Sequence, residues 1–512
     1  MTWIRLESSR KGGFIKVTLL SQGFQNLLES SRKGGIGNPG MVKIKFGTDG
    51  WRGVIADDFT FDNVRIVAQA IADYLKEEAT GNKPQGVVVG YDNRFLAEKY
   101  ALLIAEVLSG NGIKVILSNK SVPVPCVSFA IVEGKCDGGV MVTASHNPPQ
   151  FCGIKFKALY GGSATEEITE KIEKNLYGNK VSESVNPELI IKEDLIPSYL
   201  ARLKSFIDFA LIKDAGLKIV ADPMYGVASN YIEEILKDTN CNVITLHTRH
   251  DPLFGGLNPE PINENLGELE KKVKEINADI GLATDGDADR IGVVDDEGNY
   301  LTPHQVFPLL LLYLVREKGE KGKVVQTISL GYLSERIAKK CNLEFQEVPV
   351  GFKNVANLML KENIFIGGEE SGGYGYQGYI PERDGLLSSL FFVEMLAKTK
   401  KRLSALLREM EEEFGKSVYE RVDFELANTR WEGLEKKQFV QELYKRAPKK
   451  LLDIPVKEIK TYDGIEYILE DDSWLLLRPS GTEPVLRVYA ETDEIGKTEK
   501  LLAIGKEILY NA

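Results

Sequence analysis

A serine stands where a strand is expected to end. The apolar residues 140–142 predict a buried strand, and Ser145 and His146 follow at the tip of a polar turn. Asn147 precedes Pro148, and because a residue before proline avoids the right-handed helical region, the loop should hold one extended shape. A hydroxyl presented at a strand end is typical of a nucleophile. The other interpretation of these residues is a Ser/Asn turn that merely ends the strand.

A second apolar run, 280–283, is followed by three carboxylates at alternate positions: Asp285, Asp287 and Asp289. They would repel one another unless a hard cation lay among them, and ligation by oxygen alone suits Mg²⁺. A calcium-binding EF-hand loop is a poorer match, because Arg290 stands at its glycine position and Asp296 at the position of its bidentate glutamate. The remaining alternative is an acidic turn that faces solvent. We therefore expect a magnesium site.

A serine nucleophile and a magnesium site together indicate phosphoryl transfer, in which metal and cationic groups stabilise the charge on the moving phosphoryl group. Five segments occur along the chain: FGTDGWRG at 46–53, TASHNPP at 143–149, TDGDADRIG at 284–292, GEESGG at 368–373 and RPSGTEP at 478–484. With them, the sequence from Met41 to Ala512 resembles the phosphoglucomutase/phosphomannomutase group of α-D-phosphohexomutases. Any one segment could occur by chance, but all five in this order are specific.

The resemblance implies roles for the residues of the serine and metal loops. Ser145 would carry a phosphoryl group. The metal, Mg²⁺, would be held by four residues: Ser145, Asp285, Asp287 and Asp289. Arg290 would contact the oxygens of the phosphoserine, with a surface salt bridge as the alternative. Arg52 would bind phosphate near the serine loop.

Two side chains are candidates for the general acid and base that move the protons of the sugar hydroxyls. His146 titrates near neutrality but could only orient the loop. Lys155 is the candidate that we favour, since a desolvated lysine can act as acid or base. The choice between them stays open. Cys152 departs from the family, which usually carries Asn there, and we expect it to be inert packing.

The remaining site residues are implied by the sugar loop and the last segment. Glu369 and Ser371 resemble the pair that hydrogen-bonds the sugar hydroxyls, while the neighbouring Glu370 is left outside the predicted site, because it could face away. Lys353 is a further contact for the sugar or its phosphate. A guanidinium, two hydroxyls and a glycine that frees backbone N–H groups would form a phosphate clamp, made of Arg478, Ser480, Gly481 and Thr482. Its alternative is a polar turn between strands.

Composition limits the partners and the compartment. With 64 basic and 75 acidic residues, the net charge of −11 argues against nucleic acid and against an anionic membrane surface as partners. No apolar run approaches the ~20 residues that span a bilayer. The five cysteines are scattered and form no CxxC pair, which suggests a reducing cytoplasm. We expect a cytoplasmic enzyme, monomeric or homodimeric, whose partner is a small sugar phosphate.

The chain is too long for one core, and we divide it into an extension and four domains. Residues 1–40 contain the octapeptide LESSRKGG twice, at 6–13 and 28–35, and Met41 opens the part that resembles the family. We interpret this extension as disordered or artefactual, with a docking tail as the alternative. The expected domains are 41–194 with the serine loop, 195–301 with the metal loop, 302–414 with the sugar loop and 415–512 with the clamp.

Alternating strand and helix patterns predict the fold class, which is α/β. We expect three similar mixed α/β domains and a smaller, mostly antiparallel α+β domain around a central cleft, the last as the resemblance implies. Strands are predicted, among others, over 42–46, 86–90, 136–142, 218–221 and 364–367, and helices over 61–78, 97–109, 306–316 and 386–398. One strand of each of the first three domains should end at a functional loop, as at the carboxyl ends of parallel strands.

The resemblance implies a reversible phosphohexomutase that interconverts hexose 1-phosphate and hexose 6-phosphate, of glucose or mannose, through a phosphoserine. A hexose 1,6-bisphosphate would serve as bound intermediate and activator. A phosphoglucosamine mutase shares the serine and metal loops and is the closest alternative. A non-catalytic sugar-phosphate sensor on the same scaffold is the alternative from another class, although a pure binder needs no nucleophile.

Overall fold

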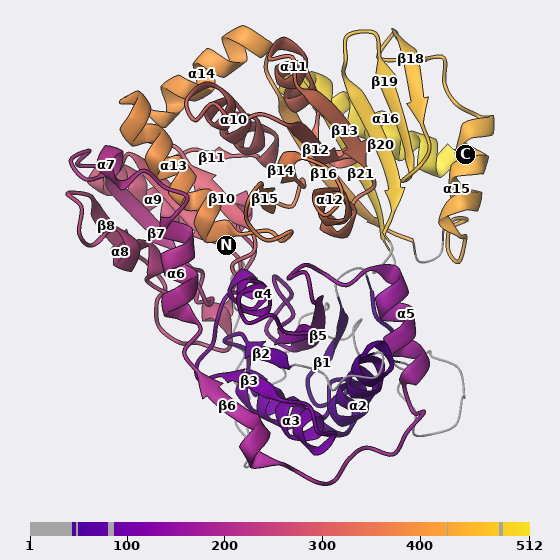
Figure 1. The fold of residues 1–512 in the computed structure, drawn as a ribbon. Helices are drawn as coiled ribbons and strands as arrows, with labels where there is room; N and C mark the ends of the chain where they lie inside the picture. The colour runs from indigo at the N-terminus through magenta and orange to yellow at the C-terminus, as the bar shows by residue number, and fades with distance from the viewer. Residues whose placement is uncertain (1–43, 48–49, 80–85, 427–428, 481–484, 512) are drawn as a thin grey trace, which may run out of the picture. The chain divides into compact units, whose positions relative to one another are not determined.

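The structure, a computed structural model, describes residues 44–47, 50–79, 86–426, 429–480 and 485–511 (Figure 1). The predicted extension 1–40 lies outside the described residues. The strand predicted over 42–46 is wrong for the described part of its range, because residues 44–46 are not in a strand. Ile44 and Phe46 are buried on either side of exposed Lys45, as in a strand. The N–H of Phe46, however, donates to Glu173, whereas a strand needs a neighbouring backbone.

The first sheet has the strand order β1-β5-β4-β2-β3-β6. The bounds are Trp51–Val54 (β1), Val87–Tyr91 (β2), Val115–Ser118 (β3), Gly138–Val142 (β4), Phe151–Ala158 (β5) and Ile190–Glu193 (β6). Helices α2 (Phe61–Glu78) and α3 (Ala97–Gly110) pack on one face with Val87 and Val89, whereas α4 (Val124–Glu133) packs on the other face with Val88. Both faces are therefore covered, which is why β2 and β4 are continuous apolar runs.

The second and third sheets repeat the topology of the first. Their strands are Lys218–Asp222 (β7), Asn242–Thr245 (β8), Ile280–Thr284 (β9), Ile291–Val294 (β10), Tyr300–Leu301 (β11), Lys323–Thr327 (β12), Glu344–Val348 (β13), Ile364–Gly368 (β14) and Tyr374–Tyr376 (β15). The orders β5-β4-β2-β3, β10-β9-β7-β8 and β15-β14-β12-β13 coincide. In each, the outermost of these four strands runs antiparallel to a parallel set. The prediction of three similar mixed α/β units is confirmed.

The repeated topology places the three functional loops in equivalent positions. Ser145 lies between β4 and β5, the aspartates lie between β9 and β10, and Glu369 lies between β14 and β15. Each loop therefore starts at the carboxyl end of a parallel strand and turns into an antiparallel strand. Ligands of open α/β sheets bind at such carboxyl ends. The predicted position of one such loop at a strand end in each unit is confirmed, whereas the function of the loops stays a prediction.

The other helices cover these sheets and connect the units. They are Glu166–Asn175 (α5), Ile196–Lys204 (α6), Phe209–Ile212 (α7), Tyr231–Leu236 (α8), Gly267–Ile276 (α9), Pro303–Arg316 (α10), Leu333–Lys340 (α11), Phe352–Met359 (α12), Gly385–Thr399 (α13), Leu403–Phe414 (α14), Lys436–Lys445 (α15) and Ile495–Asn511 (α16). Short 3₁₀ turns lie at Pro187–Leu189, Phe254–Gly256, Asn263–Asn265 and Ile328–Leu330. The helices predicted over 61–78, 97–109, 306–316 and 386–398 are confirmed as α2, α3, α10 and α13.

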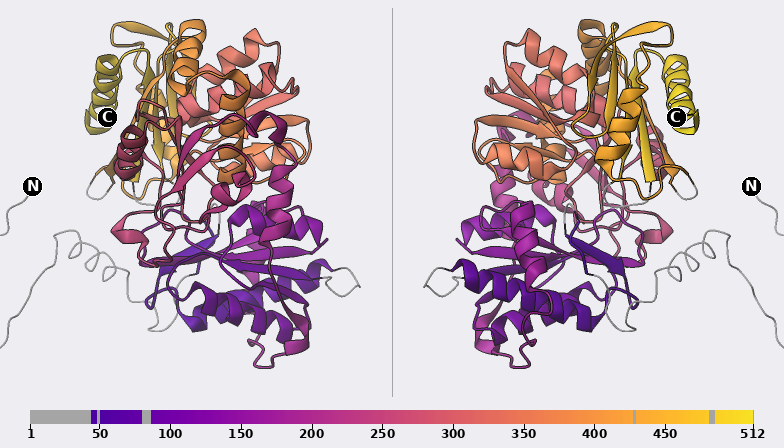
Figure 2. Two further views of the ribbon diagram at one scale, coloured as in Figure 1. Left: turned by 90° about the vertical axis from the view of Figure 1, so that its left-hand side faces the viewer. Right: turned by 90° about the vertical axis from the view of Figure 1, so that its right-hand side faces the viewer.

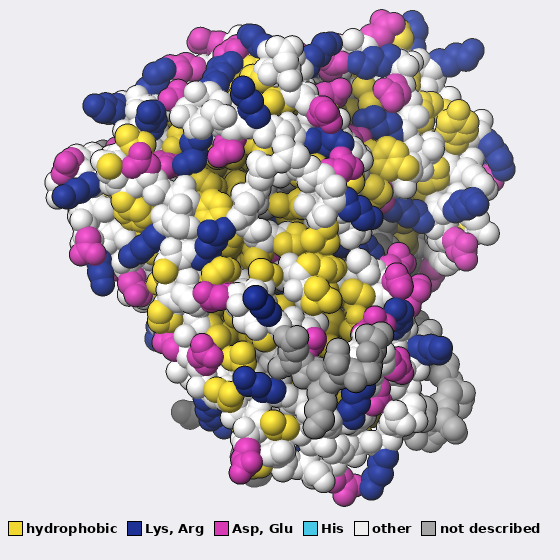
Figure 3. All heavy atoms as spheres, in the orientation of Figure 1, with side chains coloured by type: hydrophobic (Ala, Val, Ile, Leu, Met, Phe, Trp, Pro, Cys, Tyr) yellow, Lys and Arg dark blue, Asp and Glu magenta, His cyan; other side chains and the backbone are white. Residues whose placement is uncertain are grey.

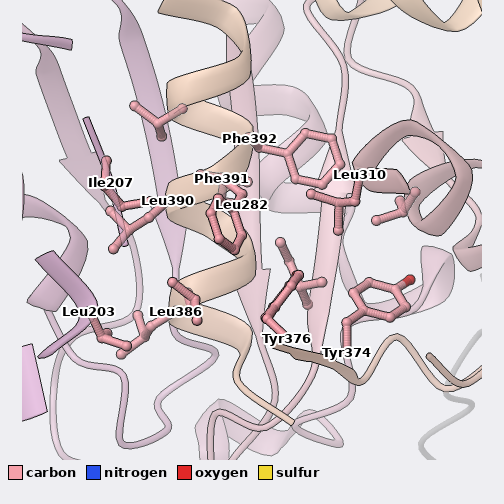
Figure 4. Packing of buried hydrophobic residues seen from close by; sticks show 14 of the residues in the cluster. Leu203, Ile207, Leu282, Leu310, Tyr374, Tyr376, Leu386, Leu390, Phe391 and Phe392 are labelled. Atoms are coloured by element: carbon pink, nitrogen blue, oxygen red, sulfur yellow. The ribbon is translucent and has the colours of Figure 1, made fainter. Parts of the chain in front are cut away.

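Helix α13 is an inner helix shared by the second and third units. Every residue from Gly385 to Ala397 is buried. Leu386, Leu390 and Phe391 lie among side chains from α6, β9, α10 and β15 (Figure 4). A helix that is apolar on all sides is a buried one. The second and third units therefore share one continuous hydrophobic core.

The last unit is an antiparallel sheet, as the resemblance implied, and its strand order is β16-β21-β20-β19-β18-β17. Its strands are Val418–Glu425 (β16), Lys450–Leu451 (β17), Ile454–Lys460 (β18), Ile465–Leu469 (β19), Trp474–Pro479 (β20) and Val485–Thr492 (β21). Helices α15 and α16 cover one face (Figure 2). The other face places Trp474 and Leu476 against Ile328 of the third unit. The exact domain boundaries stay a prediction.

Acidic and basic side chains are interspersed over the face of the molecule in Figure 3. This face therefore presents no broad basic surface. Within the described residues, no helix is both long and apolar enough to cross a membrane.

Candidate active site

Ser145 is held in a strained backbone position beside the metal loop. Its φ is 52°, in the left-handed region that few non-glycine residues adopt. The hydroxyl oxygen of Thr143 accepts the N–H of Ser145 at 2.8 Å and is itself fixed by Asp92 at 2.6 Å. Ser145 is 1% exposed, and its Oγ donates to Oδ2 of Asp285 at 2.9 Å. The structure thus brings the predicted nucleophile and the predicted metal ligands into direct contact.

Arg94, which was not identified from the sequence, holds the serine loop in place. Its guanidinium, which is buried and paired with Asp92 at 3.1 Å, donates to four backbone carbonyls, those of Ser145, Asn147, Pro148 and Phe151. Burial raises the pKa of Asp92 to about 6, although Arg94 acts in the opposite direction. A rigid guanidinium fork suits this task, because it offers several donors in one plane. Arg94 therefore fixes the loop that positions Ser145.

The three aspartates form a buried cluster that fits a hard cation. Asp285, Asp287 and Asp289 are fully buried, and each offers one oxygen within 4.8 Å of the others. Oδ1 of Asp285 accepts the N–H groups of Asp289 and Arg290, which leaves Oδ2 for the side of Ser145. Among the described residues, Oδ1 of Asp287 and Oδ1 of Asp289 are buried without a hydrogen-bond partner. Buried oxygens without partners are costly unless a cation binds them.

The electrostatics of this cluster are unequal. Burial and the neighbouring carboxylates raise the pKa of Asp285 well above its usual value. Burial acts in the same direction on Asp287, but Lys155, a hydrogen bond with Asp285 and the charge of Arg383 together outweigh it and hold the pKa of Asp287 below its usual value. The pKa of Asp289 is raised by burial, against the opposing charge of Arg383. Concentrated negative charge at one buried point is what a divalent cation would neutralise.

The two acid/base candidates have different surroundings. Lys155 stands on β5, a strand that was not predicted, and its Nζ lies 3.0 Å from Asp287 and 3.5 Å from Asp289. His146 is partly buried, with Nε2 4.0 Å from Glu260. Burial and the nearby guanidiniums, Arg290 first among them, lower the pKa of His146 well below its usual value. A histidine held neutral in this way is a poor proton donor near neutral pH.

Two predicted phosphate contacts, Arg52 and Arg290, have protein partners here. Arg52 stands on β1 and donates from Nη1 to the side-chain oxygen of Asn147, so it lies against the serine loop. Arg290 pairs with Glu260 at 3.1 Å. Glu260, which faces both Arg290 and His146, was not identified from the sequence. The predicted contacts of Arg52 and Arg290 with a phosphoserine stay predictions.

The sugar loop is tied to the metal loop by Arg383, another residue that was not identified from the sequence. One terminal nitrogen of Arg383 lies 2.6 Å from Asp289 and the other lies 3.3 Å from Glu369. Its guanidinium also stands over the ring of Phe352. One cation therefore fixes a metal-loop carboxylate and a sugar-loop carboxylate relative to each other.

The other residues of the sugar loop have separate surroundings, and their roles toward a sugar stay predictions. Oε1 of Glu369 accepts the N–H of Gly351 at 3.1 Å, and Oγ of Ser371 is buried without a partner among the described residues. Glu370, which was left outside the predicted site, accepts a hydrogen bond from the hydroxyl of Tyr419 at 2.6 Å. Lys353 is partly exposed in the first turn of α12, with no ion pair to the described part of the chain.

The clamp is described only in part, because Gly481 and Thr482 lie outside the described residues. Arg478 lies near the end of β20, is 9% exposed and donates from Nε to Asp463 at 3.0 Å. Ser480 follows the strand, and its N–H donates a hydrogen bond to the carbonyl of Val485. The predicted anion site therefore lies at a strand end, with its guanidinium held by a buried carboxylate.

Known proteins share this arrangement along nearly the whole chain. Four family descriptions match it in order, namely phosphoglucomutase/phosphomannomutase alpha/beta/alpha domain I at 43–182, domain II at 197–298, domain III at 302–414 and the C-terminal domain at 429–503. A solved structure from Thermus thermophilus is similar with a TM-score of 0.81 and 34% identity, over 91% of this chain and 99% of that chain.

Two curated relatives carry different substrate names. A phosphoglucomutase/phosphomannomutase of Thermococcus kodakarensis is 32% identical over 469 residues, covering 91% of this chain and 98% of that protein. A protein of Methanosphaera stadtmanae named "Probable phosphoglucosamine mutase" is 36% identical over 475 residues, with the same coverage. Both names are those of mutases that act on hexose phosphates. The chain is an enzyme that belongs to the phosphoglucomutase/phosphomannomutase family of phosphohexomutases.

Proposed function

We propose that this mutase interconverts hexose 1-phosphate and hexose 6-phosphate of glucose or mannose through a phosphorylated Ser145. The observation that carries the proposal is the contact of Ser145 Oγ with Asp285 at 2.9 Å, inside a buried cluster that also holds Lys155. Phosphoryl transfer needs a nucleophile and nearby positive charge, and here a hydroxyl lies beside a cation site and a desolvated ammonium. A sugar-phosphate sensor would need none of these three groups together.

The reaction proceeds in two transfers through a bound hexose 1,6-bisphosphate. In the first, the P–O bond to Ser145 breaks and a P–O bond to the sugar hydroxyl forms. That hydroxyl loses its proton and Oγ of Ser145 gains one. The sugar then turns end for end, and its other phosphate returns to Ser145. When bound to the three aspartates, Mg²⁺ would neutralise charge on the moving phosphoryl group.

Lys155 is the group that we assign to proton movement at Nζ. It is almost fully buried, within reach of the serine and metal loops, and its charge is compensated by Asp287. His146, by comparison, has its pKa depressed by burial and by neighbouring arginines. It would orient the loop and the phosphoserine. Arg52 and Arg290 would hold the phosphoseryl oxygens, while Arg478 and Ser480 would bind the phosphate that does not react.

Glucose or mannose is favoured over glucosamine by the charge at Glu369. Arg383 lies 3.3 Å from that carboxylate and compensates much of its negative charge. A carboxylate whose charge is compensated still accepts a hydrogen bond from a hydroxyl, but it attracts the ammonium of an amino sugar less strongly. Phosphoglucosamine mutase is the second candidate, because the relative from Methanosphaera stadtmanae bears that name.

Two measurements test the proposal. Wild-type enzyme incubated with glucose 1,6-bisphosphate labelled in its phosphates should acquire the label on Ser145, whereas a sensor would not be labelled. The kcat/KM values for glucose, mannose and glucosamine 1-phosphates should then rank glucosamine last. A preference for glucosamine 1-phosphate would establish the second candidate instead.

A further inference from the structure

A buried carboxylate outside the five recognised segments holds the clamp. Asp463 lies in the turn between β18 and β19 and is 2% exposed. Its Oδ2 accepts from Nε of Arg478 at 3.0 Å, and its Oδ1 contacts the ammonium of Lys436. Within the described residues, Nε is the only nitrogen of the Arg478 guanidinium with a hydrogen-bond partner. A guanidinium held at Nε has its plane fixed, so its two terminal nitrogens keep one direction.

The turn that carries Asp463 is shaped to lie directly against Arg478. Gly464 has a φ of 103°, which side chains rarely allow. A Cβ at this position would lie 2.6 Å from the carbonyl oxygen of Leu477 and 3.0 Å from Cβ of Arg478. No residue but glycine fits both the backbone and the space. The close approach of Asp463 to Arg478 is thus built into the backbone.

The same oxygen of Asp463 also reaches the third unit. Oδ2 accepts the N–H of Val350 at 2.7 Å. The next N–H, that of Gly351, donates to Oε1 of Glu369 at 3.1 Å. Two consecutive peptide N–H groups therefore bind two carboxylates: that of Asp463, which holds the clamp, and that of Glu369 in the sugar loop. Both bonds are charge-assisted, and their positions are coupled through one stretch of backbone.

We propose that Asp463 is a positioning residue, which aims Arg478 at the non-reacting phosphate and keeps the clamp in register with Glu369. The inference rests on the proposed function. Asp463 does not touch the substrate in this scheme, since it acts through the guanidinium that it holds. Its loss should therefore matter only as long as Arg478 is present.

A double-mutant cycle tests this dependence. Asp463→Asn keeps the shape but removes the charge, and it should lower kcat/KM for glucose 1-phosphate about ten-fold or more, as loss of a charge-assisted bond does. Arg478→Ala should lower it at least as much. The double variant should be no worse than Arg478→Ala alone, because residues that act as a unit are not additive. If the two losses multiply, Asp463 supports the fold independently and the proposal is wrong.

Two controls separate positioning from general damage. Asp472→Asn removes the charge from a half-exposed carboxylate that pairs with Arg336 of the third unit at 2.8 Å and with Lys457, away from the clamp, and should leave kcat/KM unchanged. Hydrolysis of the Ser145 phosphoryl group by water should be unaffected in Asp463→Asn, since that reaction does not use the clamp. A parallel loss of hydrolysis would overturn the assignment.

A second variant covers the case in which Asp463→Asn does not fold. Asp463→Glu keeps the buried charge but moves the carboxylate by one methylene, and kcat/KM should still fall several-fold. An unchanged value would contradict the proposal. The affinity for glucose 6-phosphate can also be measured by calorimetry for each variant of the double-mutant cycle. It shows whether the effect of Asp463 depends on Arg478 without relying on turnover. If wild type binds but does not turn over any hexose phosphate, the proposed function fails while the cycle still decides the role of Asp463.

Discussion

At the scale of single residues, the structure makes Ser145 dispensable for folding. Its side chain fills little space, and its contact to Asp285 joins two groups that a cation would otherwise separate. Ser145→Ala should therefore abolish mutase turnover, by at least a thousand-fold on the order expected for loss of a nucleophile. The melting temperature should stay within a few degrees of wild type. Substantial turnover by the variant, measured in a coupled assay, would exclude the phosphoserine route.

Arg383 offers a second test at this scale. It pairs with Asp289 and Glu369 at once, so Arg383→Met would take one cation away from two buried carboxylates, of which Asp289 keeps Lys155 at 3.5 Å. We expect kcat/KM for the hexose phosphate to fall roughly a hundred-fold, because each unpaired buried charge costs several kcal/mol. Arg408→Met is the matched control, since that arginine forms an exposed pair with Glu297. Equal effects of the two variants would show that Arg383 has no special role.

Most of the predicted site residues lie inside one of the five recognised segments, with Lys155 and Lys353 as exceptions. Ser145 and the aspartates follow apolar runs that predict strands, and the alternate spacing of the aspartates indicates a cation site. Arg383 was not predictable, because its partner Asp289 is 94 positions away and nothing near it in the sequence signals the pair. Arg94 was missed for a similar reason, since most of its acceptors are backbone carbonyls of a distant loop. Contacts of this kind are created by the fold.

At the scale of elements, β5 shows why a pattern can mislead. No strand was predicted there, yet Phe151–Ala158 lies between β1 and β4 in the first sheet. Its sequence contains Lys155 and Lys157, which normally mark a solvent face. Both lysines are buried, because their charges pair with Asp287 and Glu382 of other units. A buried strand whose polar residues find partners only in the assembled fold cannot be recognised by alternation alone.

Helix α13 supplies a pH test, because its N-cap is a buried acid. Asp384 accepts the N–H of Leu387 and the hydroxyls of Tyr199 and Tyr379, and burial raises its pKa to about 7. The folded state therefore keeps a proton that the unfolded state loses near pH 4. The unfolded state binds fewer protons between about pH 4 and 7, so this group lowers stability as pH rises through that range. Above about pH 7 the contribution of protonated Asp384 to stability is fully lost.

Asp384→Asn should remove this dependence while keeping the cap, since Asn is as good an N-cap as Asp. The melting temperature of the variant, relative to wild type, should be constant below about pH 4 and rise by several degrees between pH 4 and 7. The check is a series of thermal scans of both proteins at matched scan rate. A difference that does not change over this range would mean that Asp384 ionises normally in the folded protein.

At the scale of the whole molecule, the three repeated topologies explain why loops so distant in sequence meet. Each unit presents the loop after its third parallel strand at the same edge of its sheet. The strand orders coincide, whereas the sequences of the loops share little, as expected if one carries the proposed nucleophile, one the proposed metal ligands and one the proposed sugar contacts. The fold class could be predicted from alternating patterns. The coincidence of the three strand orders could not, since it lies in pairing and not in sequence.

The contact between the third and fourth units leads to the last prediction. Glu370, next to the sugar-loop residue Glu369, is held by Tyr419 at 2.6 Å and Arg421 at 3.2 Å, both on β16 of the fourth unit. If the fourth unit excludes water during transfer, weakening this contact should let water reach the phosphoserine. Tyr419→Phe removes one bond without altering the sugar loop, and Glu370→Gln weakens both.

Both variants should raise the rate of phosphoserine hydrolysis several-fold without a matching rise in mutase turnover, whereas Glu420→Gln, at an exposed position on the same strand, should leave both rates unchanged. The two rates are best measured in one preparation, with labelled phosphate release followed beside product formation. Asp463→Asn provides the contrast, because it should slow turnover without speeding hydrolysis. A fall of turnover with no gain in hydrolysis for Tyr419→Phe would mean that this contact only orients the sugar loop and that water is excluded elsewhere in the molecule.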